Sequence, residues 1–414
     1  MQDKSFVPFT EDMKKDYTIL VPNMLPMHFK LMLRIFESYG YHMELLQSDG
    51  PNIPETGLKY THNDTCYPAI LVVGQMMDAL LSGKYDPHKT ALIMFQTGGG
   101  CRASNYISLI RKALAKAGME YVPVISFSLA GLEKHPGFRV TVRKLHRLLY
   151  AVLYGDLLMT LVNQTRPYER SAGQAERMAE EWTRRLGDEL GASRRIDYGK
   201  VKENYRQIVR SFAHIPVDRS RQKPKVGIVG EIFVKYSPLG NNDLERFLIR
   251  EGAETVVPGF LDFCLFTVYN GIVDHKLYHR GRGRYLAEKA AFRLLCRKRR
   301  GMNEALTEGG LFEGVTPFEE VTDMAGEVIS RAVKMGEGWL LTAEMVELSR
   351  SGCKNIVCTQ PFGCLPNHIC GKGMMVPVKN LCPGANIVAI DYDAGASRVN
   401  QENRLKLMLA GAGQ

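Results

Sequence analysis

Two stretches decide the fold: ALIMFQTGGGC at residues 91–101 and NIVCTQPFGC at residues 355–364. Each begins with an apolar run of strand length and continues into a turn rich in Gly or Pro that carries a cysteine. A strand that leads through such a turn into a helix is typical of a parallel sheet covered by helices. Because open α/β sheets bind ligands beyond the carboxyl ends of their strands, two facing halves would direct Cys101 and Cys364 into one cleft.

The sequence around these stretches repeats the order of strand and helix. In the first half, apolar patterns predict strands at 17–21, 42–46, 91–96 and 121–126, and helices at 25–39, 104–117 and directly after Cys66. In the second half they predict strands at 226–233, 255–257, 355–359 and 387–391, with a turn at 235–242 and a final helix. The shared position of Cys101 and Cys364 indicates a weak internal duplication.

Between the halves, long charged segments of helical period replace the strand signals. We therefore divide the chain into an N-terminal α/β domain (1–136) that carries Cys66 and Cys101, a helical insertion (137–222), and a C-terminal α/β domain (223–414) that carries Cys364. The predicted fold class is α/β, with two Rossmann-like parallel-sheet domains that face a cluster cleft.

The composition is that of a soluble globular protein. Of 414 residues, 45% are hydrophobic and 24% are charged, which excludes a disordered, collagen-like or small disulfide-rich protein. The net charge of +10 favours phosphate-bearing partners without identifying them. No stretch approaches the ~20 apolar residues that span a bilayer, and the opening residues lack the apolar run of a signal peptide. We expect a cytoplasmic protein with reduced cysteines and no membrane partner.

Five of the nine cysteines fall close together, at positions 353, 358, 364, 370 and 382. Their spacing matches neither the paired C-x2-C of structural zinc nor the cysteine run of bacterial ferredoxins. A site assembled from separate loops is the better hypothesis, and its candidates, each in a Gly- or Pro-rich turn, are Cys66, Cys101 and Cys364. Cys264 and Cys296 lie in apolar or helical runs and are expected to be core residues.

Three chemistries remain open for these thiols. An iron–sulfur cluster is favoured, because backbone N–H groups at helix N-termini stabilise thiolates and cluster sulfurs. Zinc would use the same thiolates. A cysteine nucleophile would need a histidine base, for which His62 and His368, each four residues from a candidate cysteine, are the possible partners.

Three further motifs carry weaker signals. The turn at 97–105 lacks the Gly-Lys-Ser/Thr of a nucleotide-hydrolysing loop and the G-x-G-x-x-G of a dinucleotide fold. Residues 391–397 resemble a calcium loop only superficially and predict a helix capped by Ser397. The basic segment at 279–300 lacks interleaved aromatic residues, so we expect no nucleic-acid partner; it is either a solvated helix face or a docking surface for a protein or for coenzyme A phosphates.

Longer motifs carry a family resemblance: NDTCYPA (63–69), QTGGGCRASNY (96–106), VGEIFVKYSPLGN (229–241), GEGWLLTAE (336–344) and QPFGCLPNHICGKGM (360–374). Together they resemble the 2-hydroxyacyl-CoA dehydratase superfamily over residues 17–411. More closely, they are similar to its activase-related branch, which occurs alone or as the C-terminal half of long CoA-enzyme activases and is related to double-cubane cluster proteins.

The resemblance implies an oxygen-sensitive protein in which Cys66, Cys101 and Cys364 hold a four-iron cluster or half of a double-cubane cluster. It implies a low-potential electron acceptor: either a reductase component or a lyase-type, 2-hydroxyacyl-CoA dehydratase-like component with an acyl-CoA substrate. A separate ATP-hydrolysing activase would reduce it, since the chain lacks the phosphate-binding opening of the actin-like ATPases. Cys358 or Cys370 could add a ligand, and a homo- or heterodimer is expected by analogy. The alternative is a non-catalytic iron–sulfur scaffold or cluster carrier that docks an activase through the arginine-rich helix.

Overall fold

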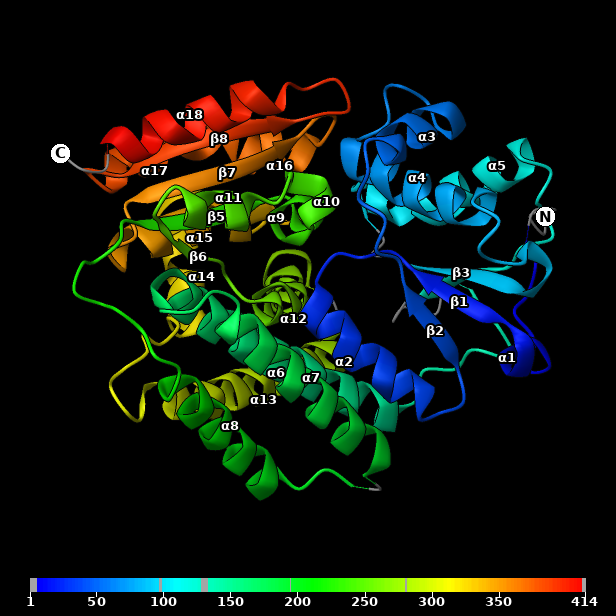
Figure 1. The fold of residues 1–414 in the computed structure, drawn as a ribbon, viewed down its shortest axis with the longest axis horizontal. Coiled ribbons are helices and arrows are strands. Elements are labelled where there is room, and N and C mark those ends of the chain that lie inside the picture. Colours follow the sequence, from blue (N-terminus) through cyan, green and yellow to red (C-terminus); the bar gives the residue numbers. More distant parts are fainter. Residues whose placement is uncertain (1–5, 97–98, 128–132, 194, 280, 412–414) are drawn as a thin grey trace.

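Two parallel sheets form the centre of the two halves. The structure is a computed structural model that describes residues 6–96, 99–127, 133–193, 195–279 and 281–411 (Figure 1). Within these residues, each sheet has four parallel strands, in the orders β2-β1-β3-β4 and β6-β5-β7-β8. In each half the second strand in the sequence lies at one edge of the sheet, followed by the first, third and fourth strands. A duplicated unit would have this shared strand order. The predicted α/β class with two Rossmann-like sheets is confirmed.

The first sheet comprises β1 (Thr18–Val21), β2 (His42–Leu45), β3 (Thr90–Phe95) and β4 (Val124–Phe127). Leu92 of the central strand β3 pairs with Leu20 of β1 on one side and with Val124 of β4 on the other, and all three are buried. The helical segments of this half are α1 (Met13–Asp16), α2 (Pro26–Glu37), α3 (Asn52–Tyr60), α4 (Tyr67–Leu81), η1 (Pro87–Lys89), η2 (Arg102–Asn105) and α5 (Tyr106–Lys116).

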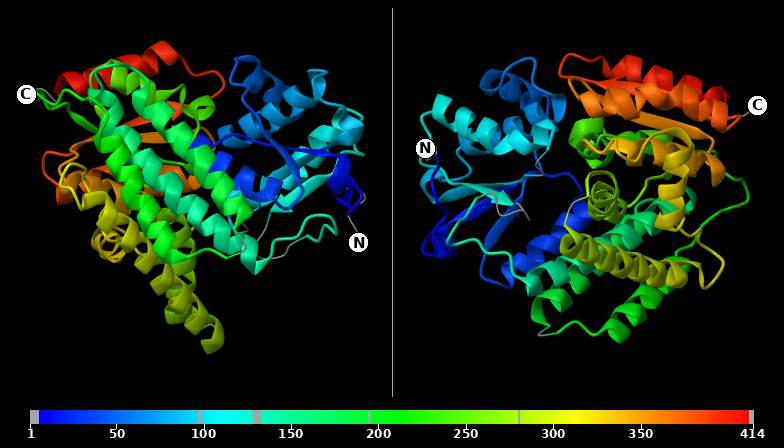
Figure 2. Two further views of the ribbon diagram at one scale, coloured as in Figure 1. Left: turned by 60° about the horizontal axis from the view of Figure 1, so that its bottom comes forward. Right: turned by 180° about the vertical axis from the view of Figure 1, so that it is seen from behind.

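A group of long helices follows: α6 (Val142–Thr165), η3 (Arg166–Tyr168), α7 (Gln174–Ala192) and α8 (Tyr198–Ala213). Helices α6 and α7 pack against α2 of the first half, while α6 also contacts α12 and α13 of the second. Figure 2 shows this group lying across one side of the molecule, beside both halves. By length and composition the segment Val142–Tyr168 could cross a membrane, yet 78% of its most apolar window is buried inside the protein. That burial is typical of a core helix in a soluble protein.

The second sheet comprises β5 (Lys225–Gly230), β6 (Glu254–Val256), β7 (Asn355–Pro361) and β8 (Asn386–Tyr392). Every residue of the central strand β7 is buried, as expected for a strand covered on both faces. The helices of this half are α9 (Ile232–Tyr236), α10 (Pro238–Asn241), α11 (Leu244–Arg250), α12 (Phe260–Tyr278), α13 (Arg282–Thr307), α14 (Phe318–Val328), α15 (Gly338–Arg350), α16 (Leu365–Cys370), η4 (Lys372–Met374), α17 (Met375–Leu381) and α18 (Arg398–Gly411).

The segment after β5 differs from the prediction. The strand expected at 226–233 ends at Gly230, and the turn expected at 235–242 forms the short helices α9 and α10. The Glu231 carboxylate accepts a hydrogen bond from the N–H of Val234 at 2.9 Å and so caps α9. Ser237 caps α10 in the same way through the N–H of Gly240, with Pro238 in the favourable first helical position.

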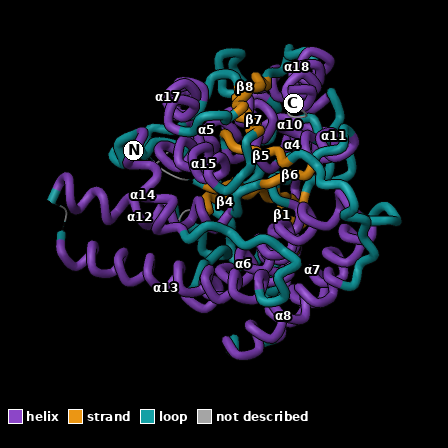
Figure 3. The backbone as a smooth tube through the Cα atoms, turned by 90° about the vertical axis from the view of Figure 1, so that its left-hand side faces the viewer, coloured by secondary structure: helices purple, strands orange, loops and turns teal. Residues whose placement is uncertain are grey.

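Helices α12 and α13 form a hairpin that projects from the body of the protein (Figure 3). The basic segment predicted at 279–300 lies mostly on α13, and its residue Arg280 falls outside the described residues. Arg293 and Arg297 are exposed, as a solvated helix face requires. Arg299 is not: it is buried, and its Nε lies 2.9 Å from Oδ1 of Asp262. At this one position the expectation of a solvated arginine is wrong, because a buried carboxylate from α12 faces the helix.

Candidate functional site

The three candidate cysteines all stand immediately before helical segments. Cys101 follows β3 and precedes η2, Cys364 follows β7 and precedes α16, and Cys66 precedes α4. None of the three makes a side-chain hydrogen bond that caps its own helix. The backbone N–H groups of Ala69, Ala103 and Asn367, at the starts of these helices, nevertheless lower the pKa of Cys66, Cys101 and Cys364 respectively. The turn before Cys101 begins at Thr97 and Gly98, which lie outside the described residues.

Backbone contacts bring Cys66 and Cys364 together across the two halves. The N–H of Tyr67 donates to the carbonyl of Phe362 at 3.0 Å. Gly363 has a φ of +72°, and a Cβ built there would lie 3.0 Å from the Cα of Cys66. Only glycine combines this left-handed backbone with so close an approach.

Cys101 completes the group from the turn after β3. A negative charge on Cys101 would raise the pKa of Cys364, and a negative charge on Cys66 would raise the pKa of Cys101. Cys101 is therefore coupled electrostatically to both of the other thiols. The turn also contacts the second half directly, since the N–H of Gly100 donates to Sδ of Met335 at 3.1 Å. The structure thus gathers thiols from both halves at the carboxyl ends of their sheets, near the place where Figure 1 shows α4 beside α10.

The site is buried and holds few polar contacts. Cys66 and Cys364 are 6% and 8% exposed, and Cys101 is half-buried. The Sγ of Cys66 lies 3.7 Å from the phenol oxygen of Tyr106, at the start of α5. Tyr106 is itself buried, so its hydroxyl is positioned to donate to a thiolate rather than to solvent.

Electrostatics keep the thiols protonated when nothing is bound to them. Burial, reinforced by the nearby carboxyls of Glu337 and Glu231, raises the pKa of Cys101 to about 12 and raises the pKa of Cys364 still more strongly. Burial also raises the pKa of Cys66, against the opposing effect of the N–H of Ala69. Because the thiolate is the reactive form, this environment suppresses a free nucleophile.

Two buried carboxyls lie next to the cysteines, and the sequence analysis did not single them out. Glu231 follows the last residue of β5, and Glu337 precedes α15 and accepts a hydrogen bond from the N–H of Ile232 at 3.0 Å. Burial and the charge of Glu337 raise the pKa of Glu231 to about 8, and burial likewise raises the pKa of Glu337. Each of these residues lies in a motif quoted above, Glu231 in GEIFVKY and Glu337 in GEGWLLTAE, and this was the sequence feature that could have identified them.

The histidines named as possible bases do not join the site. The His62 side chain is 79% exposed and pairs with Asp64 at 3.3 Å. His368 is exposed on α16, where its backbone N–H bonds to the carbonyl of Cys364. Among the hydrogen bonds of the described residues, none joins either imidazole to a cysteine sulfur. Neither histidine is therefore placed to act as the base of a cysteine nucleophile.

Four of the remaining cysteines are buried or half-buried on named strands and helices. Cys358 is fully buried in β7 with its Sγ 3.8 Å from Oδ1 of Asn367, and Cys370 is buried at the end of α16. Cys296 is buried on α13 and Cys264 half-buried on α12, as expected for core residues. All nine cysteines are free thiols.

The three candidate thiols offer sulfur donors. Cys66 and Cys364 are buried and Cys101 is half-buried. Thiolates are the ligands that iron–sulfur clusters take, and zinc also accepts them. Within the described ranges, no three His, Cys, Asp or Glu side chains stand close enough to hold a single metal ion. Comparisons with models of known protein families and with curated proteins return no match for this chain.

Proposed function

We propose that Cys66, Cys101 and Cys364 hold an iron–sulfur cluster and that the protein is a low-potential electron acceptor. The observation that supports this proposal is that two buried thiols, Cys66 and Cys364, come from different halves and lie together, with the half-buried Cys101 beside them and neither His62 nor His368 among them. The protein would act as a reductase or as a 2-hydroxyacyl-CoA dehydratase-like component. The motifs quoted above support this assignment through their resemblance to that superfamily.

The charge balance of the site favours a bound cationic group. Burial and two adjacent carboxyls raise the pKa values of the thiols, so three free thiolates are unfavourable in this site. Cys66, Cys101 and Cys364 would hold the cluster as thiolates, and its positive charge would offset their repulsion. Once bound, a cluster supplies one-electron chemistry. The chain's own part is to exclude water, to donate the Tyr106 hydroxyl toward Cys66, and to hold a proton on the Glu231–Glu337 pair.

The electron would come from a partner. We infer a cytoplasmic protein reduced by a separate ATP-hydrolysing activase, so that ATP acts only through that partner. An acyl-CoA is the substrate class that the resemblance implies, and a second subunit of the same kind would form a homo- or heterodimer. A four-iron cubane and half of a double cubane both use three thiolates and four irons per chain, so the iron content alone does not separate them.

Substitution of single cysteines tests the assignment. Cys66→Ala, Cys101→Ala and Cys364→Ala should each abolish the visible absorbance that anaerobic protein loses on treatment with dithionite. Cys296→Ala is the matched control, because that thiol is equally buried but lies on α13. Full iron content in all three site variants would contradict the proposal.

A cluster carrier without catalysis is the second candidate, and the projecting α12–α13 hairpin favours it. Leu286 and Leu294 are 62% and 50% exposed on α13, beside the exposed Arg293 and Arg297. Arg293→Glu with Arg297→Glu should abolish capture of an activase if this face docks it, while leaving the iron content unchanged. Arg299 is unsuitable for this test, because its charge is buried against Asp262.

A further inference from the structure

A cavity of about 110 Å³ lies at the amino ends of β5 and β7, away from the cysteine site. Lys225, the first residue of β5, and Cys353, two residues before β7, both line it. Cys364, by contrast, follows the carboxyl end of β7. The two ends of a strand of this length are about 20 Å apart, so the cavity is separate from the cysteine site.

The cavity is large enough for a small organic molecule. At roughly 10–15 Å³ for each water-sized group, its volume holds about seven to ten such groups. Its wall combines charged side chains with the apolar residues Val256, Val257 and Leu348. The side chain of Glu313 on the same wall is 68% exposed, so the cavity can be reached from solvent.

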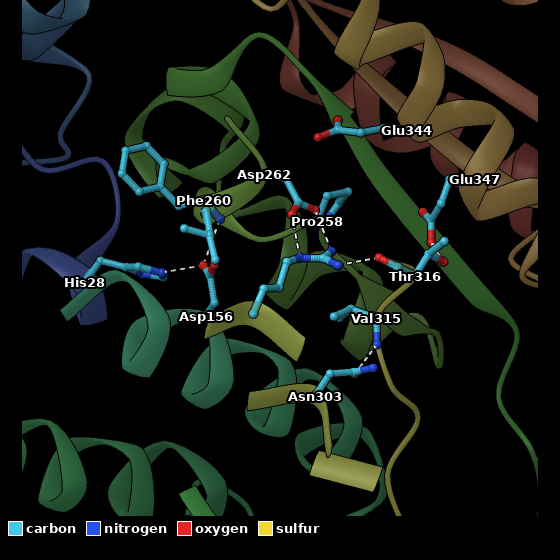
Figure 4. Close-up of polar contacts among 12 residues, drawn as sticks. His28, Asp156, Pro258, Phe260, Asp262, Asn303, Val315, Thr316, Glu344 and Glu347 are labelled. Carbon is cyan, nitrogen blue, oxygen red and sulfur yellow. Dashed lines mark hydrogen bonds and ion pairs between the residues drawn. The ribbon is translucent and has the colours of Figure 1, made fainter. Parts of the chain in front are cut away.

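Carboxyls outnumber cations on this wall. The carboxyls are those of Glu254, Asp262, Glu313, Glu344 and Glu347, and the cations are Lys225 and Arg299. Lys225 forms an ion pair with Glu313, and the Nε of Arg299 lies 2.9 Å from Oδ1 of Asp262. Lys235, which is not on the wall, lies 3.0 Å from Glu344. Figure 4 shows Asp262, Glu344 and Glu347 in this region. Each cation is thus already paired with one carboxyl.

The two remaining carboxyls, Glu254 and Glu347, have hydroxyl partners only. The phenol of Tyr168 donates to Glu254 at 2.7 Å, and the hydroxyl of Thr316 donates to Glu347. Among the ion pairs of the described residues, none includes either carboxyl. Burial raises the pKa of both, and at Glu254 the charges of Lys225 and Arg219 oppose this effect without cancelling it. Both positions therefore favour a further positive charge.

A buried hydroxyl on the wall also lacks a partner. Thr255 is 1% exposed, and its Oγ1 has no hydrogen-bond partner among the described residues. Buried polar groups normally have a partner, which a molecule in the cavity would supply. A metal ion is not indicated, because within the described ranges no three His, Cys, Asp or Glu side chains stand close enough to hold one. A cation whose charges are spread along a chain suits these separate groups better.

We propose that this cavity binds a small aliphatic diamine. One ammonium group pairs with Glu254 and the other with Glu347, the two carboxyls that have no cationic partner in the protein. The hydroxyl of Thr255 accepts a further N–H, and the methylene groups contact Val256 and Leu348. Buried carboxylates are stable when they are paired in this way. The site does not depend on the proposed function of the cysteines.

Calorimetric titration of the full-length protein with 1,4-diaminobutane tests the site. The monoamine n-butylamine, which has the same chain and one charge, should bind roughly tenfold more weakly or less, and the uncharged 1,4-butanediol should not bind. Glu254→Gln and Glu347→Gln should each weaken diamine binding by roughly tenfold and remove its advantage over n-butylamine. Thr255→Val removes one hydrogen bond and should weaken binding by roughly fivefold.

Glu320→Gln is the matched control, because Glu320 is exposed on α14 and does not line the cavity, while the variant loses the same charge. Its affinity should equal that of the unchanged protein. The comparison of the three compounds uses the unchanged protein, so it holds even if a variant fails to fold. Absence of diamine binding, or equal affinities for the diamine and n-butylamine, would overturn the proposal. Binding of Mg²⁺ that Glu254→Gln and Glu347→Gln both abolish would also overturn it, because the cavity would then be a metal site.

Discussion

The imidazole of His28 and the carboxylate of Asp156 form a buried pair, with Nε2 2.8 Å from Oδ1. The same carboxylate accepts hydrogen bonds from the backbone N–H groups of Phe260 and Leu261 at 2.8 and 2.9 Å, at the start of α12 (Figure 4). His28 belongs to α2, Asp156 to α6 and Phe260 to α12. One side chain therefore ties together the first half, the long helices and the second half.

Removal of this carboxylate should destabilise the protein. Asp156→Ala leaves the first N–H groups of α12 and the His28 ring without a buried partner, which we expect to lower the unfolding free energy by about 3 kcal/mol. Urea denaturation measures this loss. Glu180→Ala is the control, since the exposed pair of Glu180 with Lys30 contributes less than about 1 kcal/mol. A loss at Asp156 no larger than that at Glu180 would contradict the role given to Asp156.

Stability should fall as the pH rises from about 5 to 8. The folded protein raises the pKa of Glu344 to about 7 and that of Glu231 to about 8, from the unfolded value near 4.5. Between these values the folded state binds more protons than the unfolded state, so each added pH unit favours unfolding. Glu231→Gln should flatten the dependence, as measured by urea denaturation at several pH values. A stability that rises over this range in the unchanged protein would contradict the raised pKa values.

The cysteine site should react slowly with alkylating reagents. With the pKa of Cys101 at about 12, its thiolate is scarce at neutral pH, and its alkylation by iodoacetamide should accelerate roughly tenfold for each pH unit from about 7 to 9. Mass spectrometry of metal-free protein follows the reaction. Met335→Ala should accelerate labelling of Cys101, because Met335 lies over the adjacent Gly100. A rate that levels off near neutral pH would instead indicate an activated nucleophile.

Two neighbouring arginines on α13 should differ in their effect on stability. Arg299→Ala leaves the buried carboxylate of Asp262 without its positively charged partner, and we expect the unfolding free energy to fall by about 3 kcal/mol or more. Arg297→Ala removes an exposed charge and should change stability by less than about 0.5 kcal/mol. Thermal denaturation of both variants checks the contrast. Equal melting temperatures would show that the Arg299–Asp262 pair contributes nothing.

The sheets could be predicted because their strands are short apolar runs with clear ends. The strands expected at 42–46, 91–96 and 387–391 lie within one residue of β2, β3 and β8. The strand expected from 121 begins only at Val124, since Pro123 has no N–H to donate to the sheet. Helices α9 and α10 were not predicted, because their caps, Glu231 and Ser237, look like loop residues in sequence.

The candidate site could be predicted only in part. A cysteine after the central strand of each half led to Cys101 and Cys364, because the carboxyl ends of parallel strands define one edge. The carboxyls of Glu231 and Glu337 could not be found in this way. They are brought together by the packing of α9 against the start of α15, a contact between residues that are more than a hundred positions apart.

Metal analysis of protein purified without oxygen tests the central claim most directly. We expect about four irons and four sulfides per chain, little zinc, and a paramagnetic resonance signal that appears on reduction with dithionite. About eight irons per chain would indicate a larger cluster on the same cysteines in place of a single cubane. Protein that contains zinc alone, or no metal, would contradict the assignment of Cys66, Cys101 and Cys364 as cluster ligands.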